Sequence, residues 1–195
     1  SIVPATLPSF VAVGTGTQVA KVASGNLTPG EPTGTAQDDI LVCVLTTRDN
    51  VTPTMSADWE RLYTVPSGAS TAAAAWWCRR GASTPSYLIT RTGGGSGIAA
   101  VLAFRNCIAN GNPVHNFGTQ AGSVNPIIAP SINLSAAHCM LVAIAHGGVD
   151  GTCGLFDGTN PVFEEKLDDL TTEGSDCSIA VDIGIRTVAG DTGAR

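Results

Sequence analysis

The sequence predicts an all-β protein, a β-sandwich or jelly-roll-like fold made of two related halves. Three observations lead to this fold class. Apolar residues make up 43% of the 195-residue chain, charged residues make up only 13%, and 23 glycines and 11 prolines divide it into short segments. Many short apolar runs between turn residues are typical of sandwiches and barrels rather than of alternating βα units. A chain of this length and apolar content can also bury a core.

Nine segments have the length and composition of strands. They are apolar runs, or runs that alternate apolar with small or polar residues, bounded by turn residues. The predicted strands are residues 10–13, 40–47, 59–65, 71–79, 87–91, 98–105, 127–134, 139–146 and 177–186. Turns are expected at 26–34, 93–97 and 147–158, where glycine and proline are frequent.

A weak internal repeat supports the least obvious of these strands. Residues 72–75 are all alanine, which has the highest helix propensity, so 71–79 also fits a helix. However, residues 40–45 resemble 140–145, and residues 73–80 then align with 179–186. Because 179–186 alternates in the manner of a half-buried strand, its counterpart is predicted to be a strand too.

The repeat also predicts the domain organisation. An N-terminal arm with the first strands occupies 1–37, the first sandwich half 38–110 and the second half 111–195, and together they form one compact unit. In the first half a glycine-rich hairpin leads into 98–105, which is expected to pair with 72–80. The second half ends at Arg195 without a counterpart of 98–105. It is therefore predicted to lack its last strand. Either the given chain is truncated, or 177–186 has a shortened edge, an edge covered by a loop such as 112–126, or an edge that accepts a strand from a neighbouring subunit.

Charge excludes some partners. The net charge is −6, and residues 150–195 hold ten acidic residues, so no basic face is expected for nucleic acid. We interpret the acidic end as a solubilising surface, with a calcium site as the alternative. No apolar run reaches the roughly 18–20 residues of a membrane span, and the first residues lack the pattern of a signal peptide. No membrane partner is expected.

Catalytic and metal-binding motifs are weak. Ser96 lies in a glycine-rich stretch without the spacing of a nucleophile elbow, and we interpret that stretch as a turn. His138 and His146 flank one predicted strand with Asp150 just beyond, which fits a metal site or an acid–base pair, although polar strand ends explain it better. The six cysteines contain no Cys-x-x-Cys pair and are predicted to be reduced structural thiols. The sequence therefore predicts no catalytic residue, no cofactor and no metal.

Trp76 and Trp77 are the most informative pair. Neighbouring residues on a strand face opposite sides, and the repeat aligns Trp77 with the inward residue Ile183. Trp77 is therefore predicted to lie in the core and Trp76 to face outward, at a contact with a partner. The alternative is that another layer of the same protein covers Trp76.

Arginine adds further candidates for that contact. The chain has eight arginines and two lysines, and arginine is enriched at protein interfaces. Most of the arginines fall at strand ends, where protection of strand edges also explains them. The candidate interface consists of Trp76, Arg80, Asp182 and Arg186.

The order of several segments resembles β-sandwich proteins encoded among the virion genes of tailed bacteriophages. The segments are 38–44 (Asp-Asp-Ile-Leu-Val-Cys-Val), 52–54 (Thr-Pro-Thr), 58–62 (Asp-Trp-Glu-Arg-Leu), 72–80, the glycine-rich turn and 98–105. The resemblance covers about 38–106 and, more faintly, 139–186. It implies a particle component of the head or the tail, assembled in the host cytoplasm.

The leading hypothesis for function is therefore a non-enzymatic virion protein, a capsid-surface decoration or a spike. Its expected partners are other virion proteins or further copies of itself. A carbohydrate-binding module that stacks Trp76 or Trp59 on a sugar is the chief alternative, and a hydrolase is the third.

Overall fold

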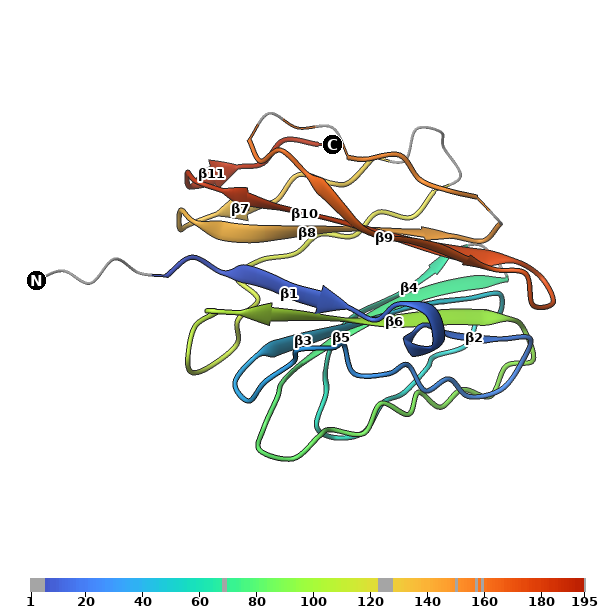
Figure 1. Ribbon diagram of the computed structural model, residues 1–195. Helices are drawn as coiled ribbons and strands as arrows, with labels where there is room; N and C mark the ends of the chain where they lie inside the picture. Colours follow the sequence, from blue (N-terminus) through green and yellow to red (C-terminus); the bar gives the residue numbers. More distant parts are fainter. Residues whose placement is uncertain are drawn as a thin grey trace, which may run out of the picture.

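The chain forms two sheets of antiparallel strands that face each other (Figure 1). This computed structural model describes residues 6–67, 70–122, 128–149, 151–156, 158 and 160–194, with Ser67 described only in its backbone. The larger sheet has the order β1-β6-β3-β5-β4, and β2 also pairs with β6. Its strands are β1 (Ser9–Val13), β2 (Ala20–Val22), β3 (Ile40–Thr47), β4 (Glu60–Ser67), β5 (Thr71–Arg79) and β6 (Gly97–Arg105).

The smaller sheet comes from the second half of the chain and has the order β8-β10-β9. Its strands are β8 (Cys139–Gly147), β9 (Glu164–Thr171) and β10 (Cys177–Arg186). A short two-stranded sheet joins β7 (Asn133–Leu134) to β11 (Gly190–Asp191). The predicted all-β sandwich fold is confirmed. In the described part of the chain, no helix is long and apolar enough to cross a membrane.

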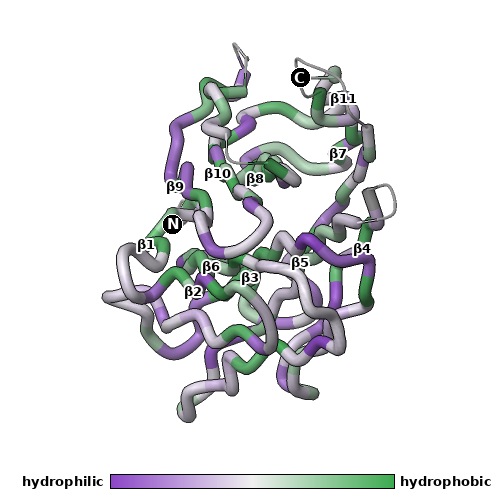
Figure 2. Tube along the Cα trace, turned by 90° about the vertical axis from the view of Figure 1, so that its right-hand side faces the viewer, coloured by the Kyte–Doolittle hydropathy of each residue, from purple (hydrophilic) through white to green (hydrophobic). Residues whose placement is uncertain are grey.

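The core has two layers because the larger sheet is covered on both faces. Figure 2, which looks along the strands, shows the smaller sheet above it and connecting loops below it. Ile40, Val42 and Val44 of β3 pack in the cluster between the sheets, whereas Leu41 and Cys43 pack in the cluster beneath the loops. A strand that is buried on both faces is apolar throughout, which explains why the prediction of 40–47 is correct to the residue.

The predicted strands 71–79 and 177–186 are also correct, including the alanine run. The prediction of 87–91 is wrong, because its residues make only isolated bridges to Leu27 and Thr54. Residues 127–134 contain only the short β7, and residue 127 lies outside the described residues. The sequence patterns missed β2, β9 and β11.

Equal registers in the two sheets agree with the predicted repeat. On β3 and β5, Val42 lies opposite Trp77, and on β8 and β10, Val142 lies opposite Ile183. The strands on the other side of β5 and β10 agree as well. Glu60 of β4 lies opposite Trp77, and Glu164 of β9 lies opposite Ile183. Both β4 and β9 also have a bulge two residues after this glutamate. A relation between the halves remains a prediction that these registers support.

The predicted pairing of 98–105 with 72–80 is wrong. β6 pairs with β3, β1 and β2, so β5 and β6 flank β3 and the glycine-rich stretch between them is not a hairpin. In that stretch a Cβ on Gly95 would lie 2.5 Å from the carbonyl oxygen of Arg48, which explains the need for glycine.

The predicted open edge on 177–186 is also wrong, because β10 lies between β8 and β9. The edge strands of the smaller sheet are β8 and β9 instead. In the predicted repeat β8 corresponds to β3, and no described strand of the smaller sheet corresponds to β6.

Candidate functional site

The expectation that Trp76 is the exposed indole is wrong. Trp76 is 2% exposed and lies in the cluster between the larger sheet and its loops, with Leu27 and Ile89. Trp77 lies on the opposite face, in the inter-sheet cluster that contains Ile183, as predicted. The alternation of faces is therefore correct, and the alternative in which another layer of the same protein covers Trp76 is confirmed.

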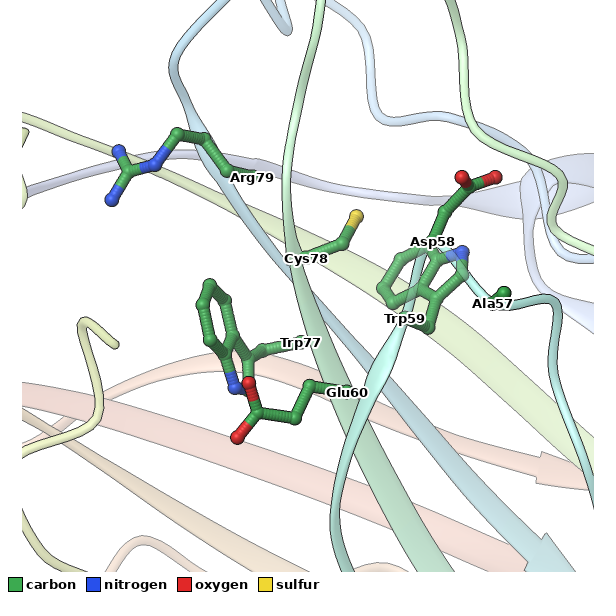
Figure 3. Close-up of a pocket in the computed structure, with 7 residues that line it drawn as sticks. All are labelled: Ala57, Asp58, Trp59, Glu60, Trp77, Cys78 and Arg79. Carbon is green, nitrogen blue, oxygen red and sulfur yellow. The ribbon is translucent and has the colours of Figure 1, made fainter. Parts of the chain in front are cut away.

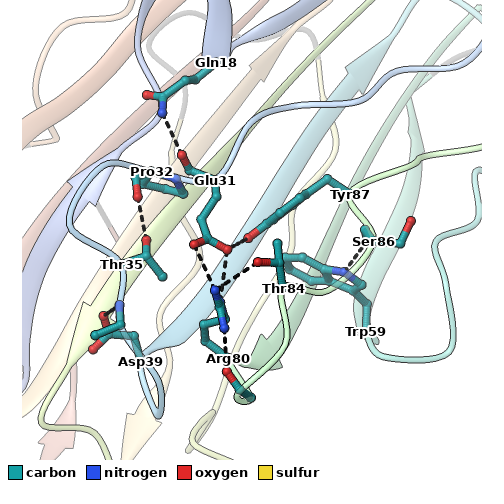
Figure 4. A network of polar contacts seen from close by, with 12 residues as sticks. Gln18, Glu31, Pro32, Thr35, Asp39, Trp59, Arg80, Thr84, Ser86 and Tyr87 are labelled. Atoms are coloured by element: carbon teal, nitrogen blue, oxygen red, sulfur yellow. Dashed lines mark hydrogen bonds and ion pairs between the residues drawn. The ribbon is translucent and has the colours of Figure 1, made fainter.

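Arg80 fastens the loops that cover Trp76 (Figure 4). Its Nε donates to Glu31 Oε2 over 3.1 Å, and the hydroxyl of Tyr87 donates to the same oxygen over 2.5 Å. Trp59 adds a hydrogen bond from its Nε1 to the carbonyl oxygen of Ser86, 2.9 Å away. Burial, followed by the hydrogen bond to Glu31, raises the pKa of Tyr87 and keeps its hydroxyl a donor. Arg80 therefore makes its contacts within this chain.

Asp182 and Arg186 have the same kind of role on β10. Asp182 is 2% exposed and accepts the backbone N–H of Phe156 over 2.7 Å. Arg186 donates to the carbonyl oxygens of Asn160, Val188 and Asp191. The two side chains hold Phe156, Asn160, Val188 and Asp191 against the outer face of the smaller sheet. The four predicted interface residues thus make internal contacts, and they do not form one surface.

His146 joins the two layers through a hydrogen-bonded chain. Thr46 of β3 donates to the carbonyl oxygen of Ser178, so its oxygen accepts from Nδ1 of His146, 2.9 Å away. Tyr63 of β4 then donates to Nε2 over 2.9 Å. The residue as a whole is partly exposed, but both ring nitrogens are engaged when the ring is neutral. Burial lowers the pKa of His146 to about 4.

The histidine arrangement considered as a metal site does not assemble in the described residues. His138 lies in an exposed turn with a positive φ of 61°, whereas His146 is bonded between the sheets. Asp150 lies outside the described residues. No group of three histidine, cysteine or carboxylate side chains suited to a metal ion is found in the part of the chain that the structure describes. All six cysteines are free, and Cys43, Cys78 and Cys177 are buried.

An open depression of about 510 Å³ lies between the beginning of β4 and the end of β5 (Figure 3). Asp58, Glu60 and Arg79 line it, together with Trp59 and Trp77. The indole Nε1 of Trp77 is buried there and has no hydrogen-bond partner. Trp59 and Trp77 are only 7% and 8% exposed, so neither presents an open ring face to a sugar.

The free edge of β8 is the remaining candidate site. β8 pairs with β10 over nine consecutive residues, and on its other side no described residue makes a backbone hydrogen bond to it. Eight of its nine residues are partly exposed, whereas every residue of β3 is buried. The segment reads Cys-Met-Leu-Val-Ala-Ile-Ala-His-Gly, with no acid, arginine, lysine or proline.

The other long edge strands of the described sheets carry features that discourage strand pairing. β4 contains Arg61, Pro66 and a bulge. β9 contains five charged residues and a bulge, and β1 has a bulge as well. Sequence reasoning missed the β8 edge because it placed β10 outermost. The signal that could have found it is the absence of charge in 139–147 compared with 60–67 and 164–171.

Comparisons with known proteins identify no relative from which a function could be inferred. No protein-family model matches the chain, and neither curated proteins nor solved structures give a significant match.

Proposed function

We propose that this protein is a non-enzymatic structural subunit of a bacteriophage virion, located on the capsid surface or in a spike, which acts by binding neighbouring subunits. The observation that carries the proposal is the free edge of β8, which has no charged residue and no proline to discourage strand pairing. Natural sheets usually protect such an edge, because an exposed row of backbone donors and acceptors pairs with other chains. In a subunit that functions by assembly, one edge of this kind can serve as the binding site for a neighbouring subunit.

The internal use of charged groups supports the proposal. Arg91 pairs with Asp49 over 2.8 Å with its side chain fully buried, and Arg105 pairs with Asp39 over 2.7 Å. Arg80 is engaged by Glu31 in the same way. These side chains fix loops to the larger sheet. These three arginines are therefore used to hold the scaffold together.

The residues expected to bind a sugar in the carbohydrate-binding alternative are not accessible. It depends on a tryptophan ring that lies open to a sugar face, and the indoles of Trp59 and Trp76 are both buried. The resemblance to virion proteins and the β8 edge favour assembly instead.

The particle itself tests this proposal. Phage particles that carry the gene for this chain are purified, and quantitative mass spectrometry measures how much of the chain they contain. A gold-labelled antibody against the isolated chain then locates it on the particles by electron microscopy. We expect the chain to sediment with the particles and the gold to mark one repeated position on the head or tail. Complete particles without the chain, combined with specific binding on a glycan array, would contradict the proposal and favour the alternative.

A further inference from the structure

We infer that the free edge of β8 binds one extended, uncharged segment of a neighbouring subunit that is a different protein, paired antiparallel to β8 in the way that β6 pairs with β3. This inference rests on the proposed assembly function and states the chemistry of the partner. The mode is strand addition, in which backbone hydrogen bonds give affinity and alternate side chains give specificity.

The equal registers of the two sheets define the position that the segment fills. In the larger sheet β3 has β5 on one side and β6 on the other. In the smaller sheet β8 has the place of β3 and β10 that of β5, in the same register. The position that corresponds to β6 adjoins β8 and has no described strand in it.

The composition of β6 indicates what fits there. β6 is nine residues long and carries one charge, at its last residue, Arg105. Ile98, Leu102 and Phe104 lie in the inter-sheet cluster, and small residues alternate with them. On β8 the residues Met140, Val142 and Ile144 pack against that cluster but are only partly buried. A segment with similar alternation would continue the apolar row and bury these three side chains further.

No described residue of the chain pairs with the free side of β8 through backbone hydrogen bonds. Residues 106–122 form no strand, and most of them are exposed. Val114 packs against the inter-sheet cluster, but the segment makes no backbone hydrogen bond to β8.

A whole second sandwich fits this edge less well than a single segment. Tyr63 of β4 reaches His146 of β8 over 2.9 Å, so the outermost strand of the larger sheet lies beneath this side of β8. Two sandwiches that met through β8 would bring two copies of β4 into the same layer. One extended segment needs no such space.

A peptide with the sequence of residues 97–104, which leaves out the charged Arg105, is the probe. It is labelled with fluorescein and titrated into the intact chain, and binding is followed by fluorescence anisotropy. Two matched peptides carry three N-methyl groups each, one on Ala100, Leu102 and Phe104 and the other on Ala99, Val101 and Ala103. Because alternate amides of a strand point to opposite sides, only one set faces β8. We expect the unmodified peptide to bind saturably and one methylated peptide to bind at least about tenfold more weakly than the other.

Hydrogen exchange with and without the unmodified peptide locates the binding, and new protection is expected within Cys139–Gly147. The inference is overturned by absence of saturable binding, by equal binding of the two methylated peptides, or by protection elsewhere. It is also overturned if the chain alone self-associates and protects the same amides, because a second copy is then the occupant. The particle experiment is independent, so a virion component that does not bind the peptide retains the proposed function and loses this inference.

Discussion

Replacing Trp76 by alanine is expected to lower the free energy of unfolding by about 3–5 kcal/mol, the usual cost of removing a large buried aromatic side chain. Trp76 is the largest of the fully buried side chains of the described chain, and the loops that carry Leu27 and Ile89 close over it. The truncation leaves a cavity that the neighbouring strand β3 fills only in part, because β3 is paired on both sides. Urea denaturation followed by circular dichroism measures the change.

Two other variants make the result specific. Trp77→Ala should cost a similar amount, since Trp77 is buried between the sheets. Leu88→Ala should change stability by less than about 0.5 kcal/mol, because Leu88 is 41% exposed. If Trp76→Ala were as mild as Leu88→Ala and weakened association instead, the burial described for Trp76 would be contradicted.

Acid is expected to destabilise the protein through His146, by about 2–3 kcal/mol between pH 6.5 and pH 4. In the folded state burial lowers the pKa of His146 to about 4, from an ordinary value of 6.5. Between these values the unfolded chain binds a proton that the folded chain does not, so stability is complete above pH 6.5 and falls as the pH approaches 4. Protonation would also remove the acceptor of the Tyr63 hydroxyl.

Chemical denaturation at a series of pH values measures this dependence. The double variant Tyr63→Phe/His146→Leu removes both members of the hydrogen bond and should flatten the profile in that range. His138→Asn is the matched control, because His138 is exposed and asparagine tolerates its positive φ. A profile that keeps its slope in the double variant, or loses it in the control, would assign the acid sensitivity to other groups.

The strands that the sequence predicted correctly are those whose environment is uniform along their length. β3 and β5 are buried on both faces, and β10 alternates between a core face and a polar outer face, so local composition was enough. β9 was missed because its charges, Glu164 and Asp168 among them, are typical of a loop. They belong instead to an edge strand that charges protect.

The candidate site could be predicted only in part, because it depends on the order of strands. Alternation placed Trp76 and Trp77 on opposite faces, but the burial of Trp76 comes from loops that are distant in sequence. The repeat indicated that a counterpart of 98–105 was missing. Because it also assumed that this strand pairs with β5, it assigned the open edge to β10. β6 pairs with β3, and the open edge is therefore on β8.

Hydrogen exchange across Cys139–Gly147, in the dilute isolated chain and in the assembled particle, tests the assembly role of β8 most directly. β10 is paired on both sides and should be protected in both states. In the isolated chain the β8 amides that bond to β10 should exchange slowly and the alternate amides quickly, and in the particle the fast set should become slow. Uniform protection of β8 in the isolated chain, or fast exchange that persists in the particle, would contradict assembly through this edge.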